Sequence, residues 1–163
     1  MKTLIIGIII IVNFILQSTV LKYTSIYNII PNTSLILVVC FAINSDKKKG
    51  ALIGFIIGIL QDIIFGKILG LNALIYMLMG YLITLANKNI FKENYIIPFL
   101  FTVLGTVSYY IFGTFFIYFL GFNMDFFNIF KNMLIMEVLY NAIISIFVYK
   151  YVYKIYKPTR NRY

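Results

Sequence analysis

The chain has 163 residues, of which 62% are hydrophobic and only 12% are charged. A soluble domain is about half apolar and about a quarter charged, so this composition predicts a membrane protein and excludes a separate soluble domain or catalytic lobe. The net charge of +9 would suggest a nucleic-acid partner in a soluble protein. In a membrane protein, basic residues collect in cytoplasmic loops, so we expect no nucleic-acid partner.

Apolar runs separated by short polar turns predict an all-α polytopic membrane protein with about six transmembrane helices. The first run is longer than the apolar region of a signal peptide and no small-residue cleavage site follows it, so we expect a retained helix. Pro31 lies near the start of the second run, either in the first turn of a helix or in a non-helical entry. One integral membrane domain is expected over 1–163, with spans at 4–21, 26–43, 50–65, 71–86, 95–120 and 126–151 and a basic tail at 152–163.

The distribution of basic residues predicts that both termini are cytoplasmic. In the six-span arrangement, eleven of the 14 basic residues fall on the side of the termini. The other three, Lys22, Lys67 and Lys131, fall on the opposite side. This asymmetry follows the positive-inside rule, and an arrangement with five spans fits it less well.

The third expected span contains glycines at four-residue spacing, Gly50, Gly54 and Gly58, followed at the same spacing by Asp62. Residues four apart share one side of a helix, so these positions form a nearly continuous stripe. Glycines in that register allow a second helix to approach closely, and this spacing therefore favours a packing surface.

Two acidic residues are expected inside the membrane, where a charge costs at least about 2.5 kcal/mol. Asp62 ends the glycine stripe, and Glu137 begins a second stripe that continues with Asn141 and Ser145. With a rise of about 1.5 Å per residue, both acids are expected near the same depth. Either they belong to a polar network that fixes helix contacts, which we favour, or they form a proton or cation path.

The sequence does not favour an enzyme. It has no histidine, one cysteine (Cys40) and five acidic residues, so it predicts no metal site, no cofactor and no catalytic residue. Tyr109, Tyr110 and Tyr118 are of the amphipathic type that gathers at membrane interfaces, and we expect them there. The basic tail could contact anionic lipid headgroups, although topology explains it equally well.

The order of these motifs resembles the MreD family of rod shape-determining proteins over about residues 31–83. In that family a Pro-Asp or Pro-Asn pair opens the second span, and a basic turn leads into a glycine-rich span that ends in Asp. Asn32 stands where many members have Asp. The matching segments here are Pro31 to Leu35, Lys47 to Asp62, Leu69 to Leu74 and Gly80 to Leu82.

The resemblance implies a non-enzymatic membrane scaffold of the bacterial cell-elongation machinery, located in the inner membrane and acting in peptidoglycan synthesis. The implied partners are an MreC-like protein, RodA with a penicillin-binding protein, and MreB indirectly. The implied fold is that of the S components of energy-coupling-factor transporters. The positions implied to matter, by shaping a helix surface for MreC, are Pro31, Gly54, Gly58, Asp62, Gly70 and Asn72.

Two other functions are compatible with the sequence. A vitamin-binding S component has a similar size and number of spans, but its first span carries small residues at four-residue spacing. Here Gly7 is followed by bulky residues, which counts against that function. A proton or cation pathway would use Asp62 and Glu137, for which intramembrane acids are the usual candidates.

Overall fold

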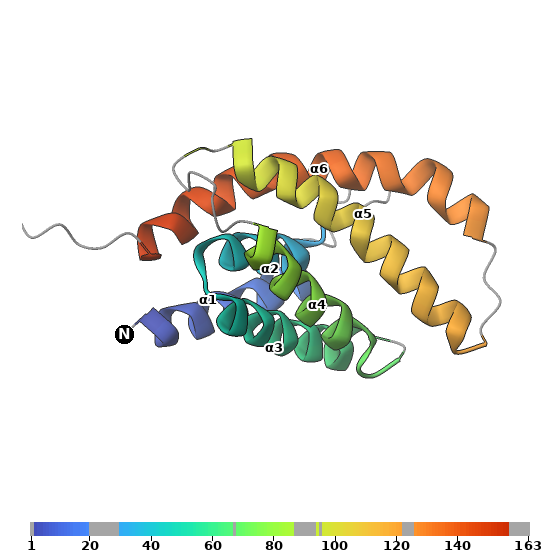
Figure 1. Ribbon diagram of the computed structural model, residues 1–163, viewed down its shortest axis with the longest axis horizontal. Coiled ribbons are helices and arrows are strands. Elements are labelled where there is room, and N and C mark those ends of the chain that lie inside the picture. Colours follow the sequence, from blue (N-terminus) through green and yellow to red (C-terminus); the bar gives the residue numbers. More distant parts are fainter. Residues whose placement is uncertain are drawn as a thin grey trace, which may run out of the picture.

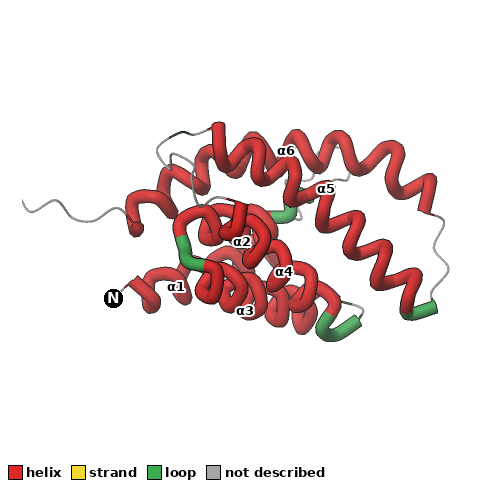
Figure 2. Tube along the Cα trace, viewed as in Figure 1, coloured by secondary structure: helices red, strands yellow, loops and turns green. Residues whose placement is uncertain are grey.

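A computed structural model describes residues 2–19, 30–66, 68–86, 94, 96–121 and 126–156, with the side chains of 2 and 126–134 left out. These residues form six α-helices joined by loops, and no strand occurs among them (Figures 1 and 2). The all-α prediction is confirmed. The helices are α1 Lys2–Thr19, α2 Thr33–Asn44, α3 Lys47–Phe65, α4 Leu71–Ala86, α5 Ile96–Phe119 and α6 Phe126–Tyr156.

Among the described residues, two helices are long and apolar enough to cross a membrane by themselves, and three shorter apolar helices accompany them, so the expected number of six spans stays a prediction. The two long helices are α5 and the Ile135–Tyr156 part of α6, and the shorter apolar helices are Thr3–Thr19, Thr33–Asn44 and Leu71–Ala86. The largest difference concerns the expected span at 26–43, which the described residues represent by the 12-residue helix α2. A helix of that length rises about 18 Å, well short of the ~30 Å hydrocarbon core.

Helix α2 begins at Thr33 because Asn32, the residue before it, is the N-cap of the helix and is not itself helical. Pro31 and Asn32 lie outside the helix, and the Asn32 side chain accepts a hydrogen bond from the Leu35 amide, as an N-cap residue does. Of the two alternatives for Pro31, the structure shows the non-helical entry.

Helix α2 forms the centre of the fold, and the other helices surround it (Figure 1). Every residue from Ser34 to Ile43 is buried, which is typical of a helix that is apolar on all sides. Helices α3 and α4 form one closely packed pair beside it, and α5 and α6 form another. The functional candidates of the sequence lie between α3 and α4, at the turn that joins them, and where α6 meets the start of α2.

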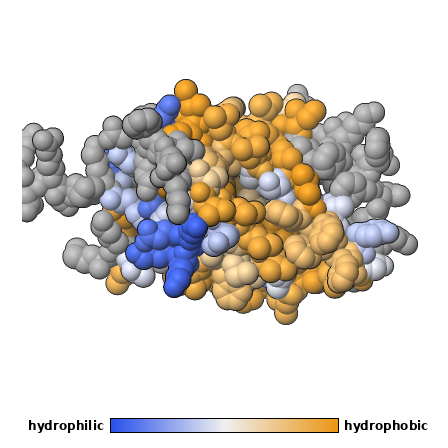
Figure 3. Space-filling view, viewed as in Figure 1, coloured by the Kyte–Doolittle hydropathy of each residue, from blue (hydrophilic) through white to orange (hydrophobic). Residues whose placement is uncertain are grey.

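The outer surface is apolar over most of the view in Figure 3, and hydrophilic side chains gather at the end where α3 begins. Large apolar side chains are exposed on several helices, for example Ile63 on α3, Leu104 on α5 and Phe147 on α6. A soluble monomer rarely exposes contiguous apolar surface on this scale, so these faces fit contact with lipid or with other membrane helices.

Candidate functional site

The glycine stripe of α3 packs directly against the backbone of α4. A Cβ atom at Gly54 would collide with the Tyr76 carbonyl oxygen, and one at Gly58 would lie 2.5 Å from the Asn72 carbonyl oxygen. Further along the helix pair, a Cβ atom at Gly50 would collide with the Gly80 carbonyl oxygen, and a Cβ atom at Gly80 would collide with the Gly50 carbonyl oxygen. The stripe is therefore covered by α4 within the chain, and a partner protein that reaches α3 meets a different face of the helix.

Asp62 continues this stripe and caps the first turn of α4. Its carboxylate accepts hydrogen bonds from the backbone N–H groups of Gly70 (2.9 Å), Asn72 (3.1 Å) and Ala73 (3.0 Å). The Asn72 side-chain amide donates a fourth, at 2.8 Å. Only 2% of Asp62 is exposed, so its cost of burial is offset by four N–H donors and by the positive end of a helix.

Gly70 explains why the cap comes from another helix. It is the N-cap residue of α4, because the Leu74 amide donates the first helical hydrogen bond to its carbonyl. Its φ is +93°, a conformation that favours glycine, and glycine has no side chain with which to cap. Asp62 supplies the missing oxygen to the second and third residues of the helix, the positions that an N-cap side chain normally serves.

Asn72 connects this cap to α5, because its side-chain oxygen accepts a hydrogen bond from the Tyr109 hydroxyl at 2.8 Å. Tyr109 packs against the rings of Tyr76 and Tyr110, with centroids 5.6 and 5.7 Å away. The expectation that Tyr109 and Tyr110 lie at a membrane interface is wrong. Both lie in the middle of α5 and bond to polar groups in the interior.

The second acidic residue, Glu137, belongs to a polar cluster between α5, α6 and the start of α2. It accepts a hydrogen bond from the Tyr110 hydroxyl, and Asn141 lies one turn further along α6. The Asn141 oxygen accepts from the Asn32 backbone amide at 2.9 Å, and Asn141 is fully buried. The cap of α2 uses the Asn32 side chain as a hydrogen-bond acceptor. An Asp side chain at this position could accept the same bond.

We expect replacement of Asn141 with leucine to lower the free energy of unfolding by about 1–3 kcal/mol, because the partly buried Asn32 amide loses its acceptor. Unfolding by SDS in mixed detergent micelles would measure the change. Replacement of Ser145 with alanine is the matched control on the same stripe, because among the described residues the Ser145 hydroxyl bonds back to the Ala142 carbonyl of its own helix and to no other group. Equal losses in both variants would contradict the assigned role of Asn141.

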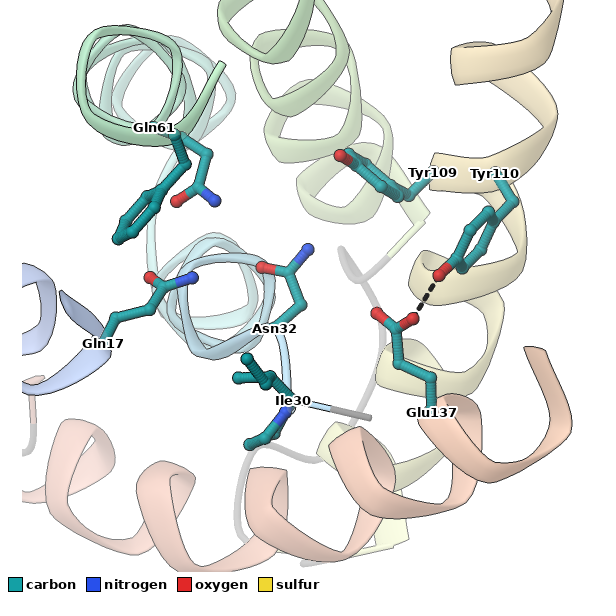
Figure 4. Close-up of a pocket in the computed structure, with 9 residues that line it drawn as sticks. Gln17, Ile30, Asn32, Gln61, Tyr109, Tyr110 and Glu137 are labelled. Carbon is teal, nitrogen blue, oxygen red and sulfur yellow. Dashed lines mark hydrogen bonds between the residues drawn. The ribbon is translucent and has the colours of Figure 1, made fainter. Parts of the chain in front are cut away.

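A pocket of about 310 Å³ lies between these clusters (Figure 4). Its wall combines side chains of α1, α3, α5 and α6 with the residues just before α2. Figure 4 shows the Gln61 amide and the Glu137 carboxylate on opposite sides of the same space. The lining residues are Gln17, Ile30, Pro31, Asn32, Gln61, Phe65, Tyr109, Tyr110 and Glu137.

The structure thus brings the sequence candidates together in two groups. Asp62, Gly70 and Asn72 meet at the turn between α3 and α4, and Glu137 and Asn141 meet the segment that contains Pro31. Sequence reasoning missed Gln61 and misplaced the two tyrosines. The positions of Tyr109 and Tyr110, well inside a long apolar run, were the signal that they lie in the middle of α5 and bond to interior polar groups.

Comparison with protein-family models gives a match to the rod shape-determining protein MreD over residues 1–157. Comparisons with curated proteins and with solved structures gave no match. The matched range covers all six helices. It includes the α3–α4 turn and the polar cluster on α6.

Proposed function

The chain belongs to the MreD family of rod shape-determining proteins, a family of non-enzymatic membrane proteins, and from this we propose that it is a scaffold of the cell-elongation machinery. The match over residues 1–157 carries the proposal, because it spans nearly the whole chain. We place the protein in the bacterial inner membrane with both termini cytoplasmic, as the basic residues favour. We also propose an S-component-like arrangement, with α2 as its central helix.

The α3–α4 pair is the part of the scaffold that we propose binds an MreC-like protein. The glycines face inward, so their role in this proposal is to set the separation of the two helices. The opposite face of α3 remains exposed and apolar, with Leu52, Phe55 and Ile63 between 40% and 66% accessible. A transmembrane helix of a partner could pack there by shape alone, which is the usual basis of helix association in lipid.

RodA with its penicillin-binding protein, and MreB indirectly, are the further partners that the family suggests. In this proposal the protein joins them by holding MreC, with no chemistry of its own. Lipid covers the remaining apolar faces of α5 and α6.

We expect Gly58→Leu to reduce co-purification of the MreC-like protein at least about tenfold and to give rounded cells. A leucine at this position collides with the backbone of Ala73 and Asn72, which separates α3 from α4. Gly7→Leu is the control, because a Cβ there has nothing within 4 Å. Membrane fractionation checks that both variants still insert. Normal co-purification and normal shape with Gly58→Leu would overturn the proposal.

A further inference from the structure

The outer face of α6 combines a row of apolar side chains with two lysines near the C-terminal end of the helix. Leu139, Ile143 and Phe147 are 48%, 52% and 64% exposed. Lys150 and Lys154 are exposed as well and continue the row. Residues three or four apart share one side of a helix, so these five side chains form one line, which we call the α6 stripe. The proposed scaffold function gives the two lysines no role.

The length of the α6 stripe matches one leaflet of a bilayer. From Leu139 to Lys150 the helix rises about 16 Å, and half of a hydrocarbon core of ~30 Å is about 15 Å. Tyr151, next to Lys150, is 69% exposed, and exposed tyrosine is typical of the headgroup level of a membrane. An acyl chain can therefore lie along the apolar part of the stripe while its headgroup meets the lysines.

The acidic residues of the whole sequence are too few and too distant to neutralise both lysines of the α6 stripe. There are five of them, and two accept hydrogen bonds in the interior, as described above. Asp46 forms an ion pair with Lys49. Asp125 directly precedes the first residue of α6, about 36 Å along the helix from Lys150. Only Glu93 is left for two lysines, so at least one of them has no acidic side chain of the chain as a partner.

Three more lysines add positive charge at the same end of the molecule. The Tyr156 hydroxyl, at the end of α6, lies 3.0 Å from the Ser45 hydroxyl in the turn before α3. Lys47, Lys48 and Lys49 follow in the first turn of α3, where Figure 3 shows hydrophilic side chains beside an apolar surface. Anionic headgroups are attracted to such clusters, by roughly fivefold in affinity for each lysine near the membrane surface.

We propose that the α6 stripe binds an anionic phospholipid, with Lys150 and Lys154 at its headgroup and its acyl chain along the apolar side chains. A lipid fits better than a soluble anion, because the lysines continue an apolar face that is long enough for an acyl chain. The positive-inside rule accounts for the side of the membrane on which the lysines lie, and the proposal adds a preference among the lipids of that side. It is independent of partner binding by α3 and α4.

The test measures lipid retention by the full-length protein with native mass spectrometry. The protein in dodecyl maltoside micelles receives equal amounts of phosphatidylglycerol and phosphatidylcholine that carry the same acyl chains. We expect phosphatidylglycerol to be retained at least about fivefold more than phosphatidylcholine. Glycerol 3-phosphate, which has the charge but no acyl chain, should not displace it at the same concentration. Equal retention of the two lipids, or displacement by glycerol 3-phosphate, would overturn the proposal.

Double variants locate the binding. Lys150→Gln with Lys154→Gln removes both charges from exposed positions, so the fold should persist while the preference for phosphatidylglycerol falls several-fold. Lys150→Arg with Lys154→Arg keeps the charge and should keep the preference. Arg160→Gln with Arg162→Gln makes the same change of charge in the basic tail, outside the described residues, and should have a smaller effect. An unchanged preference in the Lys→Gln variant, or an equal loss in the tail variant or the Lys→Arg variant, would overturn the proposed site.

Discussion

Replacing Gly54 with alanine should destabilise the protein by about 1–3 kcal/mol or more, although alanine is normally the better helix former. The added methyl group would collide with the Tyr76 carbonyl oxygen, which belongs to the backbone of α4 and cannot rotate away. This collision can be relieved only if α3 and α4 move apart along the whole length of their contact. SDS unfolding in mixed micelles would measure the loss.

Gly7→Ala is the matched control for this prediction. It makes the same substitution in the first half of helix α1, where a Cβ atom would have nothing within 4 Å. There we expect no loss, or a gain of up to about 1 kcal/mol from helix propensity. Equal stability of the Gly54→Ala variant and the unaltered protein would mean that the two helices are not in backbone contact.

The difference between these two glycines shows what a sequence pattern can establish. The spacing of Gly50, Gly54 and Gly58 is local information, and it is sufficient to predict close approach of a second helix on that side. It does not identify which helix approaches. The family resemblance suggested a partner's helix, whereas in the structure α4, the next helix of the same chain, occupies the stripe.

The interior polar residues were harder to place from sequence. A tyrosine suits both a membrane interface and a buried hydrogen-bonded site, so residue type alone placed Tyr109 and Tyr110 wrongly. Their actual partners, Asn72 and Glu137, lie 37 and 27 residues away along the chain. Gln61 follows no periodic pattern. Its place in the wall of the pocket depends on helices that are distant in the sequence and meet only in the folded chain.

The short helix α2 has a similar explanation. Hydropathy places the start of an apolar run but is insensitive to a cap, so the expected span included Pro31 and residues before it. The start of the helix is set by Asn32, whose side chain bonds to Leu35 and whose backbone amide bonds to Asn141. The second of these bonds is a tertiary contact and leaves no local signal.

Removal of the Asp62 carboxylate should have an effect as large as that of the glycine substitution. In Asp62→Ala, three backbone N–H groups and the Asn72 amide lose their shared acceptor. Loss of an N-cap and of charge-assisted hydrogen bonds predicts a fall of at least about 2 kcal/mol in the free energy of unfolding. Because Gly70 has no side chain, the N-cap residue itself cannot supply an acceptor in place of the lost carboxylate.

Asp62→Asn separates the cap from a role in proton or cation transfer. Asparagine retains one acceptor oxygen, so the cap interpretation predicts a stability between those of Asp62→Ala and the unaltered protein. Asp46→Ala is the control, because Asp46 precedes α3 without a side-chain capping bond and its ion pair with Lys49 is exposed. Full stability of Asp62→Ala, combined with loss of a proton flux into liposomes, would instead assign Asp62 to a transfer path. Under the cap interpretation, the Asp62 carboxylate stabilises the turn between α3 and α4, and the glycines allow the close contact of the two helices. The helix pair that we propose as the partner-binding element depends on both.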